Sequence, residues 1–154
     1  MTEASVDWRD AHPSDEPFLR SLWAATFGST FAMLPEPLAS QLCSQQYDMQ
    51  LAGYRQRLQG CTVHVVQRGA EPVGRVILAA EPARVEIVDL AILPAFQGTG
   101  VGSEVIRRVL AEAAGTPVQL WVEHSRPRAR ALYERLGFVE VETSATHARM
   151  EWHG

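Results

Sequence analysis

The chain has 154 residues, the length of one domain, so we expect 1–154 to form a single domain with its own core. Hydrophobic residues make up 46% and charged residues 21%, which excludes a disordered or collagen-like chain, and no apolar run reaches the roughly 18 residues of a membrane span. The net charge of −4 disfavours nucleic acid as a partner and fits a neutral or cationic small substrate.

The first half of the chain predicts one strand, two helices and then three strands. Alternation of Val6 and Trp8 with charged residues indicates the first strand, and apolar residues at helical spacing indicate the helices. Three β-branched runs separated by turn residues then predict an antiparallel meander. The expected elements are a strand at 5–9, helices near 15–26 and 38–58 around a loop at 28–37, and strands at 62–68, 72–80 and 84–93.

The second half alternates helices and strands. Val101, Val105 and Val109 line one face of its clearest helix. The expected elements are a helix at 101–114, a strand at 118–122, a helix from Ser125 to the closing Gly137, and strands at 138–143 and 147–152. The strands on either side of the first of these helices should pair in parallel through a right-handed crossover. The sequence therefore predicts an α/β fold with a mixed central sheet of about six to seven strands and about four helices.

A glycine-rich turn lies between the strand at 84–93 and the next helix. Gly98, Gly100 and Gly102 let the backbone approach an anion closely, and the free N–H groups of the helix start favour negative charge. The turn therefore predicts a phosphate site. It is not a P-loop, because no Gly-Lys-Ser/Thr follows, and Ser103 replaces the third glycine of the dinucleotide fingerprint. A nucleotide-binding module nevertheless stays open as an alternative.

Two segments resemble the GNAT superfamily of acetyl-CoA-dependent N-acetyltransferases. Gln97, Gly100 and Gly102 match the family's Q/R-x-x-G-x-G/A signature. The stretch 129–138, ARALYERLGF, matches A-x-x-L-Y-E-x-x-G-F, which follows the fifth strand in these enzymes. The resemblance covers about 84–140 and implies a GNAT-like acyl-CoA-binding fold.

The resemblance also implies where acetyl-CoA, the co-substrate, binds. In this family the turn cradles the pyrophosphate, and the preceding strand offers backbone groups to the pantetheine arm and the thioester oxygen. The residues so implied are Leu90, Ala91 and Ile92 on the strand, and Gln97, Gly98, Thr99, Gly100, Val101, Gly102 and Ser103 in the turn. Arg126 stands where the family often has an Asn that contacts pantetheine, so its side chain is expected either at a cofactor phosphate or in solvent.

Acetyl transfer by direct attack of a primary amine needs a proton acceptor and a proton donor. Tyr133 occupies the family's general-acid position, and a phenol with a pKa near 10 suits protonation of the departing thiolate. Glu86 is the candidate base, since some family members that acetylate proteins carry a catalytic Glu in this register. Asp89 is a second candidate for a base or substrate contact and, if buried, needs a partner such as Arg75. Strand alternation puts the two carboxylates on opposite faces unless a bulge intervenes, and His124 or a water is the remaining alternative base.

The acceptor is expected to be an amine of a small molecule or peptide, contacted by residues of the first two helices and their loop. The candidates are Phe27, Phe31, Met33, Tyr47 and Tyr54. The histidines show no metal-ligand spacing, so no metal is expected. Cys43 and Cys61 are too few for a disulfide scaffold and favour a reducing, cytoplasmic location. A non-catalytic acyl-CoA-binding sensor or interaction module is the alternative function, and the final strands are a candidate homodimer surface.

Overall fold

The computed structural model describes residues 5–27, 33–57 and 60–154 and contains seven strands and four α-helices within them. The elements are β1 (Val6–Asp10), α1 (Glu16–Phe27), α2 (Leu38–Arg57), β2 (Cys61–Arg68), β3 (Glu71–Ala80), β4 (Val85–Ile92), α3 (Val101–Ala113), β5 (Val118–Glu123), α4 (Pro127–Arg135), β6 (Val139–Thr143) and β7 (His147–Trp152). Single 3₁₀ turns, η1 (Pro13–Asp15) and η3 (Pro94–Phe96), precede α1 and follow β4. The predicted α/β class is confirmed, and the predicted bounds agree to within about two residues at each end.

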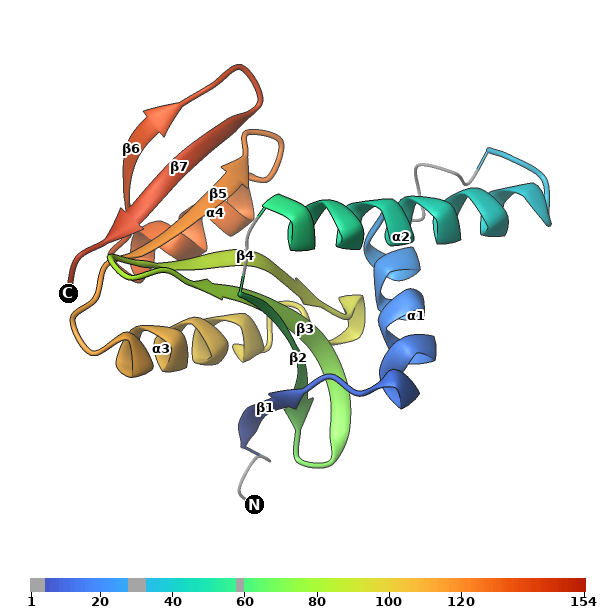
Figure 1. Cartoon of the computed structure of the whole chain (residues 1–154), viewed down its shortest axis with the longest axis horizontal. Helices are drawn as coiled ribbons and strands as arrows, with labels where there is room; N and C mark the ends of the chain where they lie inside the picture. Colours follow the sequence, from blue (N-terminus) through green and yellow to red (C-terminus); the bar gives the residue numbers. More distant parts are fainter. Residues whose placement is uncertain (1–4, 28–32, 58–59) are drawn as a thin grey trace.

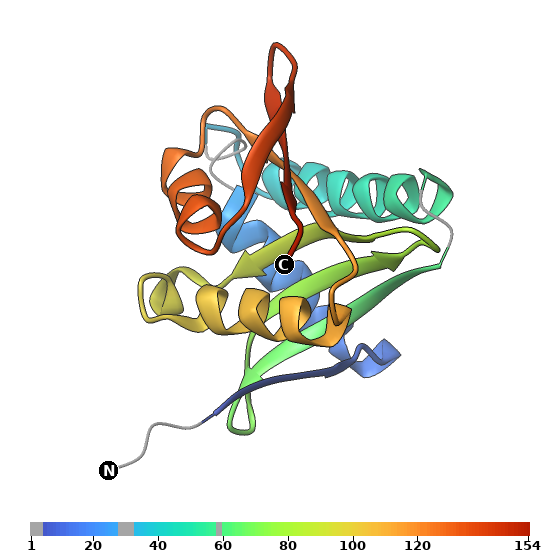
Figure 2. The same cartoon turned by 90° about the vertical axis from the view of Figure 1, so that its left-hand side faces the viewer.

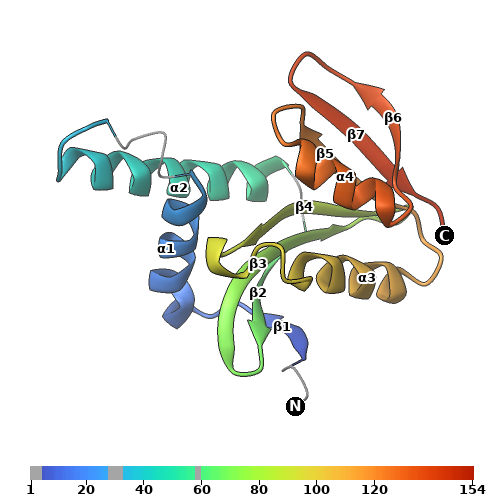
Figure 3. The same cartoon turned by 180° about the vertical axis from the view of Figure 1, so that it is seen from behind.

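All seven strands belong to one sheet, in the order β1-β2-β3-β4-β5-β7-β6 (Figure 1). Strands β1 to β4 form the predicted antiparallel meander, and β4 pairs with β5 in parallel, as the strand–helix–strand unit predicted. Figure 3 shows α2 and the β6–β7 hairpin on either side of β4. No helix in the described part of the chain is long and apolar enough to cross a membrane.

The sheet separates two hydrophobic clusters. Val65 and Val66 are neighbours on β2, and each belongs to a different cluster because successive strand residues point to opposite faces. The larger cluster joins the apolar stripe of α3 to β5 and β7, and the smaller one joins α1 and α2 to β2. Figure 2 shows α3 and α4 on one side of the sheet and α2 on the other.

Strands β4 and β5 pair over only three positions, from Val85–Val118 to Ile87–Leu120. Beyond them β4 still pairs with β3, but no described strand bonds to its other edge. The backbone edge of β4 from Val88 to Ile92 is therefore left available on the β5 side. A cavity lies at this opening between β4 and β5.

Candidate active site

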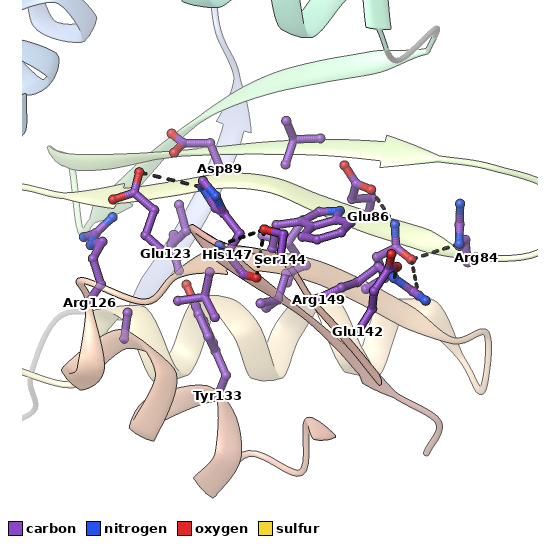
Figure 4. Close-up of a pocket in the computed structure, with 18 of the residues that line it drawn as sticks. Arg84, Glu86, Asp89, Glu123, Arg126, Tyr133, Glu142, Ser144, His147 and Arg149 are labelled. Carbon is purple, nitrogen blue, oxygen red and sulfur yellow. Dashed lines mark hydrogen bonds and ion pairs between the residues drawn. The ribbon is translucent and has the colours of Figure 1, made fainter. Parts of the chain in front are cut away.

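A cavity of about 1230 Å³ opens where β4 and β5 part (Figure 4). Its lining comes from the two strands, from α4, from the β6–β7 hairpin, and from Gln50 and Gly53 of α2. Many of the lining residues are charged, with carboxylates and arginines from at least three elements facing one space. Such a cavity suits a polar substrate that carries a charge of its own.

A β-bulge in β4 brings two of the predicted catalytic residues into this cavity. Ile77 lies opposite Asp89, whereas Leu78 lies opposite Ile87, so Val88 is an extra residue in the strand. The extra residue shifts the alternation by one position, and Glu86 and Asp89 therefore both line the cavity. Of the two arrangements that the sequence left open, the structure has the bulged one.

Asp89 has the arginine partner that the sequence suggested. Arg75 donates from Nε to Oδ2 of Asp89 over 3.1 Å and also donates from Nη2, and both side chains are largely buried. Burial raises the pKa of Tyr47 on α2, Glu16 adds to this, and the charge and hydrogen bond of Arg75 oppose it. Arg75 therefore ties Asp89 to the helical layer and balances its charge.

Glu86 lacks such a partner. It is only 7% exposed, and Nε2 of Gln119 donates to its Oε1 over 2.6 Å. No described arginine or histidine forms an ion pair with this carboxylate. Glu86 is therefore a buried carboxylate whose immediate partner is neutral.

Tyr133 enters the cavity from α4, on the opposite face of the sheet from α2. Figure 4 shows its hydroxyl directed toward the opening between β4 and β5. Burial raises the pKa of Tyr133, Arg126 lowers it, and Asp89 raises it further. The centroid of its ring lies 6.0 Å from that of the Phe138 ring, and this packing fixes the Cβ end of the side chain in the core. The phenol can therefore hold its proton until a strong acceptor appears.

The glycine turn lies beyond the end of β4 and does not line the cavity. Gly98 and Gly100 have φ angles of 78° and 91°, which side chains rarely adopt. The amide of Glu104 is the first in α3 to bond a helix carbonyl, that of Gly100, so the N–H groups of 101–103 are free of partners among the described residues. The side chain of Gln97 folds back and donates to the Ile92 carbonyl over 3.0 Å. The turn thus presents free N–H groups at the positive end of a helix, an arrangement that is favourable for an anion.

The remaining predicted cofactor residues fall at different depths. Leu90 lines the cavity, Ala91 is buried, and the Ile92 carbonyl is taken by Gln97. Arg126 begins α4 as an exposed residue at the cavity rim. His124 does not line the cavity, and its Nε2 lies 2.8 Å from the Ser144 carbonyl oxygen.

Of the expected acceptor contacts from the first two helices and their loop, only the side chains of Tyr47 and Met33 are described, and neither lines the cavity. Tyr47 is a core residue that packs with Trp23, and Met33 is 95% exposed outside the cavity. Phe31 lies outside the described residues, as do the side chains of Phe27 and Tyr54. The helical layer contributes Gln50 and Gly53 instead. Aromatic content alone did not separate core packing from a binding surface.

Several cavity residues were missed from the sequence. On β5, Gln119, Trp121 and Glu123 line the cavity, and on β7 His147 and Arg149 do so. Nε2 of His147 lies 3.9 Å from Oε1 of Glu123. The signal was the strict alternation in β5, whose polar and aromatic residues occupy one face of a strand that is apolar on the other. Within the described residues, no group of three or more His, Cys, Asp or Glu could hold a metal ion.

Comparison with known sequences identifies the family to which the chain belongs. The sequence model of the acetyltransferase (GNAT) family matches residues 17–138. The mycothiol acetyltransferase of Clavibacter sepedonicus is 40% identical over 85 residues, which are 51% of this chain and 28% of that protein. The mycothiol acetyltransferase of Nocardia farcinica is 31% identical over 104 residues, 68% of this chain and 27% of that protein. The matched part of the chain therefore covers less than a third of the length of each of these curated relatives.

Comparison with solved structures gives the same fold. The PaiA N-acetyltransferase of Thermoplasma acidophilum, solved in complex with coenzyme A, superposes with a TM-score of 0.73 at 15% identity, over 97% of this chain and 99% of that one. The spermidine N-acetyltransferase of Vibrio cholerae, solved with CoA and spermine, superposes with a TM-score of 0.66 at 22% identity, over 95% and 94% of the two chains. At these identities the likeness concerns the fold.

Proposed function

Because the chain belongs to the GNAT family of acetyltransferases, we propose that it transfers the acetyl group of acetyl-CoA to a primary amine of a small molecule or peptide. One observation carries this proposal: Tyr133, Glu86 and Asp89 line a single cavity at the opening between β4 and β5. A proton donor and two carboxylates converge there, which is what amine acetylation requires.

The chain fits acetyl-CoA at two places. The free N–H groups at the start of α3, with Gln97, Gly98, Thr99 and Gly100 before them, would bind the pyrophosphate. The β4 edge from Leu90 to Ile92, which pairs with β3 on its other side only, would bind the pantetheine arm. Arg126, at the rim of the same opening, would contact the cofactor from α4.

We propose direct attack in a ternary complex. Glu86 accepts the proton of the ammonium, through a water, and the neutral nitrogen attacks the thioester carbonyl. The new C–N bond forms in a tetrahedral intermediate, its collapse breaks the C–S bond, and Tyr133 gives its proton to the departing thiolate. The nitrogen then loses its second proton, which passes to the Tyr133 phenolate directly or through water and restores the phenol. Burial raises the pKa of Tyr133, so the phenol stays protonated until the thiolate forms.

The two carboxylates take different parts in this proposal. Arg75 balances the charge of Asp89 and fixes its position, which lowers its value as a proton acceptor. Asp89 would therefore orient the acceptor amine rather than take its proton. Glu86, whose partner is the neutral amide of Gln119, is the better base.

The acceptor class is an amine, and two named relatives suggest where to begin. Mycothiol acetyltransferases and a spermidine N-acetyltransferase are similar to this chain in sequence and in fold respectively. A screen of thiol release from acetyl-CoA should therefore include polyamines such as spermidine and amines related to mycothiol. Binding of acetyl-CoA without turnover of any amine would favour the acyl-CoA sensor instead.

We extend the proposal to the cellular location, the oligomeric state and the domain organisation of the protein. The chain has only two cysteines, too few for a disulfide scaffold, which supports a reducing, cytoplasmic location. The edge strand β6 exposes Val139 and Val141, which supports a homodimer formed through this edge. Light scattering tests the dimer, and limited proteolysis tests whether 1–154 behaves as one domain.

The proposal is tested by calorimetric titration of acetyl-CoA against the wild type, Gly100→Glu and Gly115→Glu. Gly100 and Gly115 lie at opposite ends of α3, have φ angles of 91° and 90°, and have no atom within 4 Å of an added Cβ. The strain of substitution is therefore matched, at about 1–2 kcal/mol. We expect Gly100→Glu alone to weaken binding, by about 100-fold or more. A wild type that does not bind acetyl-CoA contradicts the proposal.

A further inference from the structure

Gln119 lies directly beside the proposed base. It is the central residue of the short β4–β5 pairing, where it is the register partner of Glu86, and it is only 3% exposed. The register places both side chains on the cavity face of the sheet. Buried polar groups are stable only when they are hydrogen-bonded, so both the oxygen and the nitrogen of the Gln119 amide need partners.

The orientation of the Gln119 amide is determined by its partners. Its Oε1 accepts hydrogen bonds from Nη1 of Arg84 over 2.9 Å and from Nη1 of Arg149 over 3.2 Å. Its Nε2 donates to Glu86 over 2.6 Å. Guanidinium groups only donate and a carboxylate only accepts, so a flipped amide would lose all three bonds. The amide is therefore held with its oxygen toward the arginines and its nitrogen toward Glu86.

The two arginines are already paired with other carboxylates. Nε of Arg84 donates to Glu81 over 2.9 Å, and Nε of Arg149 donates to Glu142 over 2.9 Å. Arg149 also forms an ion pair with Glu151. Their charges are thus balanced at the cavity rim, and Gln119 stands between them and Glu86.

We infer that Gln119 is a positioning residue that separates Glu86 from Arg84 and Arg149 and keeps this carboxylate available to the substrate amine. An arginine in direct contact would make the carboxylate a poorer proton acceptor. The Gln119 amide donates a hydrogen bond to Glu86 but has no net charge, so it does not place a positive charge against the carboxylate. The inference rests on the proposed role of Glu86 as the base.

Glu86 is surrounded by charged groups from several elements. Asp89 shares its strand, Glu123 follows on β5, and Arg84 precedes it on the β3–β4 turn. The other charged residues that line the cavity are Glu81 from the same turn, Arg126 at the start of α4, Glu142 from β6, and His147 and Arg149 from β7, and Glu151 of β7 is paired with Arg149. The lining residues from α2, Gln50 and Gly53, carry no charge. Gln119 is the described residue that touches Glu86 itself.

The test is the pH dependence of kcat/KM for Gln119→Glu. The substitution keeps the shape of the side chain but puts a second carboxylate against Glu86, and two carboxylates in contact share a proton. We expect the acid limb of the profile to move to higher pH by about one unit or more, with the rate recovering at alkaline pH. Merely structural damage would lower the rate at every pH instead.

Gln50→Glu is the matched control. It adds the same charge to the same cavity, but Gln50 bonds Nε1 of Trp23 and not Glu86. Whatever its effect on rate, its acid limb should stay at the wild-type pH. An equal shift in both variants overturns the inference, because the cavity charge alone would then explain it.

Two further measurements separate failure of the inference from failure of the proposed function. If Glu86→Gln removes the acid limb but Gln119→Glu leaves it in place, Glu86 is the base and the inference is wrong. If Glu86→Gln keeps the acid limb, both the proposed role of Glu86 as the base and the inference about Gln119 are wrong.

A carbon-13 titration of the glutamate carboxyls needs no turnover. The Glu86 signal is assigned by its loss in Glu86→Gln. A midpoint shift of this signal in Gln119→Glu, and none in Gln50→Glu, supports the inference even without an acceptor.

Discussion

The two faces of β5 differ in what they contact: one packs in the hydrophobic core and the other faces the cavity. On one face Val118, Leu120 and Val122 are buried against α3 in the larger hydrophobic cluster. On the other face Gln119, Trp121 and Glu123 line the charged cavity. A single six-residue strand thus has an apolar face that is packed against α3 and a polar face that is turned to the cavity, and Leu120 and Val122 of the apolar face also reach the cavity wall.

The difference teaches that stability and chemistry are separated here by the period of a strand rather than by distance along the chain. Substitutions at adjacent positions should therefore have unlike effects. Truncation of the apolar residues packed against α3 should mainly change the free energy of unfolding, and substitution of the polar residues that face the cavity should mainly change the rate. Four predictions test that separation, beginning with the largest effect.

The first prediction compares Leu120→Ala with Trp121→Ala. Leu120 is 2% exposed, so its truncation should lower the free energy of unfolding by about 2–5 kcal/mol. Trp121 is 44% exposed, so its truncation should cost less than about 1 kcal/mol. Urea unfolding of both variants measures this directly. Equal losses would break the comparison between the faces.

The second prediction concerns Glu86→Gln. Loss of the proposed base should lower kcat/KM by about 100-fold or more. Because the variant replaces a buried carboxylate by a neutral group of the same shape, its unfolding free energy should not fall by more than about 1 kcal/mol. Steady-state kinetics and urea unfolding of one preparation check both statements. A rate close to the wild type would move the base to another group.

The third prediction concerns Tyr133, whose ring packs against the larger hydrophobic cluster and whose hydroxyl is directed toward the cavity. Tyr133→Phe should lower kcat roughly tenfold to hundredfold while leaving acetyl-CoA affinity nearly unchanged. Since burial raises the pKa of Tyr133 above its usual 10, its loss of a proton should not limit the rate below pH 10. The measurements are single-turnover rates and a pH profile. A Tyr133-dependent alkaline limb below pH 10 would contradict this assignment.

The fourth prediction concerns a carboxylate far from the cavity. Arg9 donates two hydrogen bonds of 2.7 Å to Asp15 and the His12 amide donates a third of 2.8 Å, which lowers the pKa of Asp15 from 3.8 to about 2. A lowered pKa stabilises the fold above the unfolded value near 4, and this contribution is lost as pH falls through about 2.

Asp15→Asn should therefore lower the free energy of unfolding by roughly 1–2 kcal/mol at pH 7, with allowance for solvent screening. The difference from the wild type should shrink between pH 4 and pH 2, while the rate at pH 7 is unaffected. Urea unfolding across this range provides the measurement. A difference that is independent of pH would assign the effect to something other than the Asp15 charge.

Local patterns were sufficient to predict most of the secondary structure. The helix at Val101–Ala113 and the strand at Val118–Glu123 follow from apolar spacing within a few residues, which depends on neighbours along the chain. The turn before α3 was predicted for the same reason, because positive φ angles at Gly98 and Gly100 are a local demand that glycine satisfies. Local patterns did not predict that Tyr47 is a core residue or that Met33 is exposed outside the cavity, because the surroundings of a side chain depend on what packs against it.

The sequence by itself determined the order of the elements, the parallel unit around α3 and the position of the glycine turn, since each rests on residues close in the chain. Only the tertiary structure decided that Glu86 and Asp89 share a cavity, because the bulge at Val88 is a property of pairing with β3. It alone also joined Gln119 to Arg84, Arg149 and Glu86 across three separate segments. Such contacts depend on register between distant strands, which no local pattern encodes.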